Sequence, residues 1–337
     1  MFQKLCIVCC AMQMSMTVVV DAYIPSKHPD AAVTRRRLLE TATVSILTSV
    51  IPTFVNAEEF TTTGGGGGGG ATTAIPEVVV QVSGDAKKLF NEGRAYESQG
   101  NMAAAQRVYG KVTLISPRFV YGWSNLGNTQ TALGDLRTAE ASYNKAIELC
   151  EETFNQEGGG RKCNDLYILL LNRGSIRLND GMVKEALEDL TRSDALRGRP
   201  DSIVLQNLAR AKELNGLYQS ADRDYATAIG LSSNEVNPFW LRAALVKFQL
   251  GDIKGAFDLL KRVENRFPEA PEVRAAYAVL LATAKDDRFA GQRKFLEIPD
   301  RQRLKYSDSE YLEKTIAWPP AMRQELAKIT QAVGDSK

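Results

Sequence analysis

The chain has 337 residues, with 42 Lys and Arg against 40 Asp and Glu, a formal net charge of +2 and 44% apolar residues. Its single histidine, His28, lies near the amino terminus. Histidine is the usual general base near neutral pH and the commonest metal ligand. The composition therefore argues against histidine-based catalysis in the body of the chain, and the charge balance argues against nucleic acid as a partner.

Two targeting signals are predicted in tandem in the first 57 residues. Residues 1–22 carry Lys4 and then an apolar run, which is typical of a signal peptide. Residues 23–57 contain Arg35, Arg36 and Arg37, then a weakly apolar stretch that ends in a small residue, Ala57. This second pattern matches a twin-arginine signal with its cleavage site.

The tandem arrangement resembles the bipartite presequence of algae whose plastids came from a eukaryotic endosymbiont. The resemblance implies entry into the secretory route, a transit peptide that begins at Tyr23, and delivery to the thylakoid lumen. Two alternatives stay open: either apolar stretch could remain as a membrane anchor, although each is shorter than a spanning helix needs, or the chain could be a secreted bacterial protein.

Removal of the leader leaves a neutral chain with a flexible start. The leader holds five Lys and Arg and three Asp and Glu, so 37 residues of each sign remain. Seven consecutive glycines, Gly64 to Gly70, lack the Lys-Ser or Lys-Thr of a phosphate-binding loop, and we interpret residues 58–84 as a flexible linker.

The next 200 residues repeat with a period of 34 or 35. Gly93 and Gly127, Ala105 and Ala139, and Tyr109 and Tyr143 are each 34 residues apart. Small residues at such positions let two antiparallel helices cross closely, and a glycine between the helices permits a left-handed cap. The same slots recur in three later repeats, after a 13-residue insertion before the third, and a sixth repeat keeps fewer of them.

This pattern resembles the tetratricopeptide repeat over residues 85–298. The resemblance implies an all-α, right-handed superhelical solenoid of five to six helix-turn-helix repeats that binds other proteins. Residues 299–337 are predicted to form a C-terminal cap that covers the last repeat, with a docking element as the alternative.

In tetratricopeptide arrays the first helices line a groove, and their sixth positions face it. Here these positions are Asn91, Asn125, Asn172, Asn207 and Arg242. A column of asparagines can hold the backbone amides of an extended peptide, and Arg242 can then hold a carboxylate. The alternative is that these side chains hydrogen-bond a neighbouring helix.

Cys150 and Cys163 flank the 13-residue insertion and are the two cysteines left after the leader is removed. The triglycine between them lets the chain turn back, which allows a disulfide in an oxidising compartment. Two free thiols at helix ends are the alternative.

The sequence thus predicts a protein without a cofactor, a metal site or catalytic residues that binds protein or peptide clients. Similar repeat proteins of thylakoids and cyanobacteria are often assembly or maintenance factors for photosynthetic complexes, so the resemblance implies photosystem subunits as clients. The alternative is a general chaperone-like adaptor for lumenal or periplasmic proteins.

Overall fold

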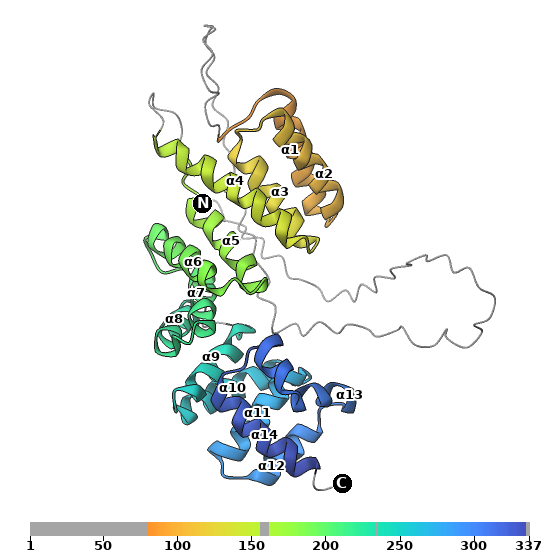
Figure 1. The fold of residues 1–337 in the computed structure, drawn as a ribbon, viewed down its shortest axis with the longest axis vertical. Helices are drawn as coiled ribbons and strands as arrows, with labels where there is room; N and C mark the ends of the chain where they lie inside the picture. Colours follow the sequence, from red (N-terminus) through yellow and green to blue (C-terminus); the bar gives the residue numbers. More distant parts are fainter. Residues whose placement is uncertain (1–79, 156–161, 233–234, 335–337) are drawn as a thin grey trace, which may run out of the picture. The chain divides into compact units, whose positions relative to one another are not determined.

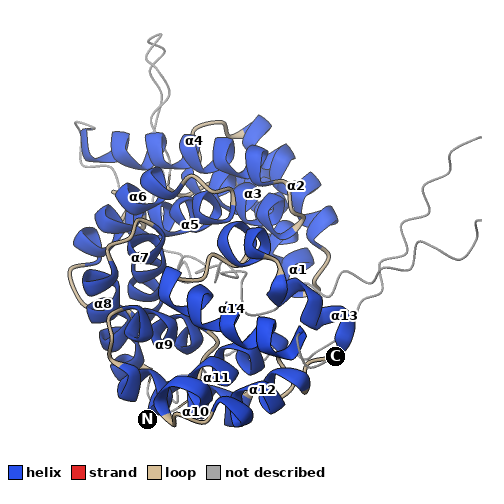
Figure 2. Cartoon of the chain, turned by 60° about the horizontal axis from the view of Figure 1, so that its bottom comes forward, coloured by secondary structure: helices blue, strands red, loops and turns tan. Residues whose placement is uncertain are grey.

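The computed structural model describes residues 80–155, 162–232 and 235–334. The two targeting signals with Arg35, Arg36 and Arg37, and most of the Gly-rich linker, lie outside the described residues. The described part of the chain is helical and contains no β-strand (Figure 2). The expected all-α class is therefore confirmed.

Six pairs of helices follow one another along the described chain, and neighbouring helices pack together in chain order (Figure 1). They are α1 (Gly84–Ser98) with α2 (Met102–Ile115), α3 (Val120–Ala132) with α4 (Leu136–Asn155), α5 (Leu166–Asn179) with α6 (Val183–Arg197), α7 (Ser202–Leu214) with α8 (Tyr218–Leu231), α9 (Phe239–Gln249) with α10 (Ile253–Arg266), and α11 (Pro271–Ala284) with α12 (Arg288–Leu296). We number these pairs as repeats one to six, and the chain is an all-α repeat solenoid.

Glycines end the first helices of repeats one to five, as the sequence predicted. Gly100 and Gly134 adopt φ values of +73° and +82°, and their counterparts in the next three repeats also have positive φ. A residue with a β-carbon is strained in this left-handed conformation, so glycine is favoured at each turn.

Within a repeat, the second helix places a large side chain over the small residue of the first. A β-carbon on Gly93 would lie 2.5 Å from the ring of Tyr109, and one on Gly127 would lie 3.0 Å from the ring of Tyr143. Both tyrosines are fully buried. The tyrosine therefore packs on the glycine of its own repeat.

This close packing makes the repeat glycines sensitive to the smallest substitution. The ring of Tyr109 has no open space to move into, because it is fully buried. We expect Gly93→Ala to lower the free energy of unfolding by about 1–3 kcal/mol, the usual cost of overpacking. In Gly110→Ala, on the open side of α2, the new methyl meets nothing within 4 Å. That variant should gain about 0.5–1 kcal/mol from helix propensity. Urea unfolding of both variants tests the contrast, and equal effects would refute it.

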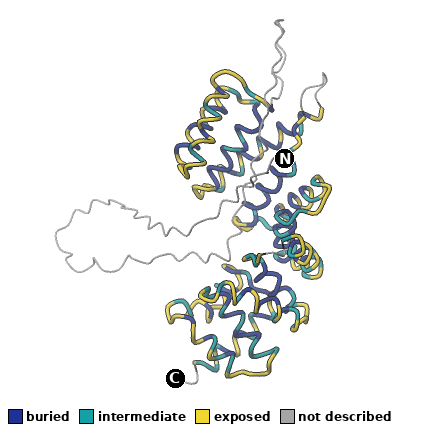
Figure 3. The backbone as a smooth tube through the Cα atoms, turned by 180° about the vertical axis from the view of Figure 1, so that it is seen from behind, coloured by how far each residue is buried: buried dark blue, intermediate teal, exposed yellow. Residues whose placement is uncertain are grey.

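Buried residues lie mainly along the helices, which also carry exposed residues, and exposed residues are frequent at the connections between them (Figure 3). Large side chains such as Trp240, Leu170 and Leu190 are almost completely buried. Each helix pair therefore contributes to a core that continues from one repeat to the next.

The carboxyl-terminal segment is irregular before it ends in a helix. The short helix α13 (Asp300–Arg303), a 3₁₀ turn η1 (Leu304–Ser307) and a π turn η2 (Tyr311–Thr315) lead to α14 (Pro320–Gly334). Helix α14 packs against α11 and α12, and it also reaches α9. The segment therefore covers the last repeat and also extends over part of repeat five, which the sequence did not predict.

The structure joins Cys150 and Cys163 in a disulfide, with their Cα atoms 5.3 Å apart. Both cysteines are fully buried, and the amide of Cys163 donates to the hydroxyl of Thr153. Helix α4 continues beyond Cys150 to Asn155, so the cysteine lies inside the last turns of the helix and not at its end. The bridge ties repeat two to the start of repeat three.

Candidate functional site

The sixth residues of the first helices lie on one side of the array, which we call the inner face. In repeats one and two, side chains of this face form a hydrogen-bonded chain between neighbouring repeats. The hydroxyl of Tyr109 donates to the carboxylate of Glu97 and accepts a bond from the amide of Asn125, 3.2 Å away. Asn125 thus reaches back from repeat two to repeat one.

The same arrangement continues in the middle of the array. The hydroxyl of Tyr143 donates to the side-chain oxygen of Asn128 at 2.7 Å, and that oxygen also accepts from the amide of Asn172 at 3.2 Å. Asn207 accepts a bond from the hydroxyl of Ser175 at 3.3 Å and donates to the backbone carbonyl of Ile203 at 2.8 Å. Each asparagine is therefore used within the array.

In repeats four and five, charged groups replace the amides. The carboxylate of Glu213 accepts from the hydroxyl of Tyr225 at 2.9 Å and pairs with Arg242, and Arg210 approaches the same carboxylate to 3.0 Å. Glu272 lies 3.7 Å from Arg242 on the other side. These charged side chains are all largely buried, so two arginines and two glutamates balance one another inside the array.

Arg242 also holds the backbone of the carboxyl-terminal segment. Its guanidinium donates to the carbonyl of Ile316 at 3.1 Å and to that of Ala317 at 2.7 Å. The indole nitrogen of Trp318 donates to Glu272 at 2.9 Å. Side chains from the first helices of repeats five and six therefore bind main-chain and ring atoms of a non-helical segment.

These contacts correct the prediction of an open column of amides. Asn172 and Asn207 are each 1% exposed and Arg242 is 5% exposed, and all three are already hydrogen-bonded inside the chain. The prediction that they offer free groups to a partner is wrong, and the alternative of a bond to a neighbouring helix is right. Asn91 is exposed and Asn125 is partly exposed, so these two stay candidates for partner contact.

The sequence analysis missed the acceptors of this network. Glu97 and Glu213 each precede the repeat tyrosine by 12 residues, and this shared spacing could have identified the pair. Repeat two has Thr131 at that position, and Tyr143 turns to Asn128 instead. No spacing signal connects Arg242 with Ile316, because the contact spans 74 residues outside the period.

The pKa values of the two inner glutamates are shifted in opposite directions. Burial on its own raises the pKa of Glu213, but Arg242 and Arg210 outweigh it and hold the pKa below its ordinary value. For Glu272, burial dominates over the attraction of Arg242 and the bond from Trp318, and its pKa is raised. Glu213 is therefore held as a carboxylate, and Glu272 takes up a proton more readily than an exposed glutamate.

The raised pKa of Glu272 gives a testable dependence on pH. Since the folded chain binds this proton more tightly than the unfolded chain, protonation of Glu272 adds stability as the pH falls through its folded pKa. Glu272→Gln has no such proton, so we expect its stability relative to the unmodified chain to be greatest above the raised pKa of Glu272 and to decline as the pH falls towards the ordinary range of a glutamate. Melting temperatures over this range test the prediction. A difference that does not change with pH would contradict it.

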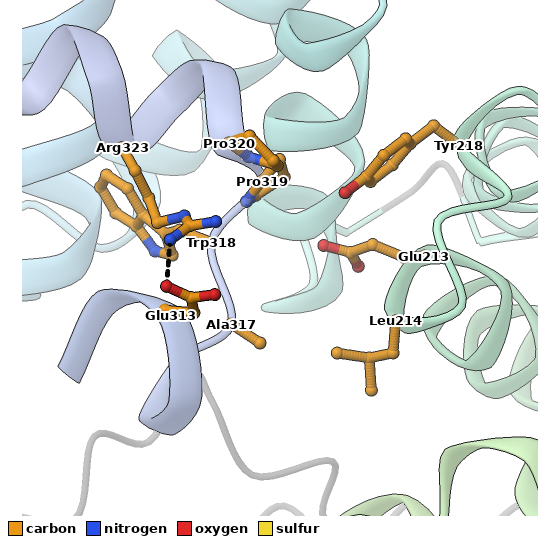
Figure 4. Close-up of a pocket in the computed structure, with 9 residues that line it drawn as sticks. All are labelled: Glu213, Leu214, Tyr218, Glu313, Ala317, Trp318, Pro319, Pro320 and Arg323. Atoms are coloured by element: carbon orange, nitrogen blue, oxygen red, sulfur yellow. Dashed lines mark hydrogen bonds and ion pairs between the residues drawn. The ribbon is translucent and has the colours of Figure 1, made fainter. Parts of the chain in front are cut away.

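A cavity of about 230 Å³ lies between repeat four and the carboxyl-terminal segment (Figure 4). Leu214 and Tyr218 form one wall, and Trp318 and Pro319 form part of the other. Arg323 donates to Glu313 at its edge. The space between the segment and repeat four is therefore a pocket that opens to solvent.

The described residues hold neither a candidate metal site nor a candidate membrane span. None of their His, Cys, Asp and Glu side chains gather in a group of three or more that could hold a metal ion. Within the same ranges, no helix is long and apolar enough to cross a membrane.

Comparison with protein families agrees with the repeat pattern. Models described as tetratricopeptide repeat match residues 88–119, 120–153 and 240–270. These three segments are similar to tetratricopeptide repeats. No curated protein sequence matches the chain.

Solved structures resemble the chain at the level of the fold. A tetratricopeptide repeat protein from Parabacteroides merdae ATCC 43184 is 16% identical, with a TM-score of 0.50, and the match covers 73% of this chain and 98% of that one. The Cut9-Hcn1 hetero-tetramer of the APC/C matches with 18% identity and a TM-score of 0.50 over 69% of this chain and 42% of the other. At such identities the likeness concerns the solenoid alone.

Proposed function

We propose that this chain is a non-catalytic scaffold that binds protein segments on the inner face of its repeats. The observation that supports this most strongly is the main-chain recognition by Arg242, which already holds the carbonyls of Ile316 and Ala317. Array side chains that hold backbone carbonyls can recognise a protein segment with little regard to its side chains. The mature chain also lacks histidine, which agrees with a role in binding.

We further propose that the protein works in the thylakoid lumen, as an assembly or maintenance factor for photosynthetic complexes. The support is the tandem leader, with Arg35, Arg36 and Arg37 ahead of the cleavage site at Ala57. Replacement of the three arginines by lysine should stop delivery to the lumen in an import assay. Unchanged processing to a chain that starts at Glu58 would refute the twin-arginine route.

Capture of partners from solubilised thylakoid membranes tests the function itself. We expect an affinity-tagged chain to recover subunits of a photosystem in preference to soluble proteins. Recovery of a broad set of soluble lumenal proteins would favour the chaperone-like adaptor, and recovery of neither would contradict both proposals.

A further inference from the structure

The carboxyl-terminal segment binds to the array in the manner of a peptide ligand. Between η2 and α14 the chain is not helical, and Ile316, Ala317 and Trp318 present two carbonyls and an indole to the repeats. The next contact follows at Ala321, whose amide donates to the side chain of Gln249 at 2.8 Å.

Each array residue in these contacts lies on the first helix of its repeat. Arg242, Gln249 and Glu272 lie on α9 and α11 and meet backbone atoms or a ring nitrogen, not a charged side chain of the segment. A seat of this kind favours an uncharged, non-helical stretch with an aromatic residue followed by proline, as in Trp318, Pro319 and Pro320.

The contact between the carboxyl-terminal segment and these array residues is imperfect. Ala317 has φ of +46°, a conformation that is strained for a residue with a β-carbon. The second carboxylate oxygen of Glu272 is buried and finds no hydrogen-bond partner among the described residues. The pocket beside Pro319 and Pro320, which Figure 4 shows between these prolines and Tyr218, leaves room for an additional side chain. A segment that lacked these defects would bind the same seat more favourably.

We propose that residues 311–323 are an internal ligand of the inner face, and that a partner segment with an aromatic residue followed by prolines displaces them. The seat consists of Arg242, Gln249 and Glu272. This inference rests on the proposed scaffold function and adds to it the binding site and the chemistry of the partner segment. It also predicts that the unmodified chain binds the partner segment weakly, because the built-in segment competes for the same site.

Binding of a defined peptide tests the seat without a natural partner. The probe is a fluorescein-labelled peptide with the sequence of residues 311–323, and the protein is the full chain. We expect Trp318→Ala, which weakens the internal ligand but leaves the seat intact, to bind the peptide at least tenfold more tightly than the unmodified chain. A peptide with alanine in place of its tryptophan should not bind.

Array substitutions in the Trp318→Ala background locate the binding. Gln249→Ala removes one seat contact at a partly exposed position and should weaken peptide binding several-fold. Lys254→Ala, an exposed residue of α10, should leave it unchanged. Equal binding to the unmodified chain and to Trp318→Ala, or binding that ignores the tryptophan of the peptide, would overturn the proposal.

Proteolytic cleavage of the folded chain provides the same test if Trp318→Ala fails to fold. A protease site inserted between Asp308 and Ser309, which are both exposed, lets the chain be cleaved after folding with every seat contact retained. We expect the labelled peptide to exchange with the released fragment. If the fragment stays bound through gel filtration and the peptide does not bind, the fragment is a permanent part of the core. That result would refute displacement. Failure to capture a photosystem subunit would leave these peptide results unaffected, so the two proposals fail separately.

Discussion

Glu213→Ala is expected to destabilise the array by about 3–5 kcal/mol, the usual cost of removing one partner from a buried ion pair. The substitution leaves Arg210 and Arg242 buried with Glu272 as the one remaining counter-charge of the cluster. It also removes the acceptor of the Tyr225 hydroxyl. Urea unfolding monitored by circular dichroism measures the loss.

A surface ion pair supplies the matched control. Glu235 and Arg266 are 4.0 Å apart, and both side chains are more than half exposed. Glu235→Ala should therefore change the stability by less than about 0.5 kcal/mol. If the two glutamate variants unfold at the same urea concentration, the inner charged cluster contributes no more than a surface pair, and our description of it is wrong.

Reduction of the Cys150–Cys163 disulfide should be the second large effect. The bridge closes a loop of about 14 residues, for which the chain-entropy estimate is about 3 kcal/mol. For a chain of this size that corresponds to a fall in melting temperature of about 5–10 °C. The comparison is a thermal melt of the oxidised protein with and without reductant.

The control for reduction is the double variant Cys150→Ala, Cys163→Ala. Reductant should not change its melting temperature, because it has no bridge to lose. Complete alkylation of both thiols in the protein from its native compartment, before any reductant is added, would show that the bridge is absent there.

The repeat architecture could be predicted from the sequence because its causes are local and periodic. Gly93 and Tyr109 meet within one repeat, and Gly100 ends a helix through its own backbone conformation. Both requirements recur with every repeat, so a single chain displays them several times.

Whether the polar groups of the inner face are free or already hydrogen-bonded could not be predicted in the same way. The period placed Asn172, Asn207 and Arg242 on one side, but it carried no information on whether their polar groups were already bonded. That depends on acceptors in the preceding repeat, such as Asn128, and for Arg242 on a segment 74 residues later. Contacts outside the period leave no repeated signal in the sequence.

The same limit applies to the carboxyl-terminal segment. Met322, Leu326 and Ile329 gave α14 an apolar side, and the structure buries all three. Such a side predicts that the helix packs against something. It does not predict that α14 reaches α9 as well as the last repeat.

Site-specific photocrosslinking tests the central claim, that the inner face binds the partner. A benzophenone amino acid replaces Asn91, an exposed inner-face residue of α1, or Lys111, an exposed residue of the second helix of the same repeat. After illumination in thylakoid membranes, we expect a discrete crosslinked partner from position 91 and none from position 111. Crosslinking from position 111 alone, or equal crosslinking from both positions, would contradict the account.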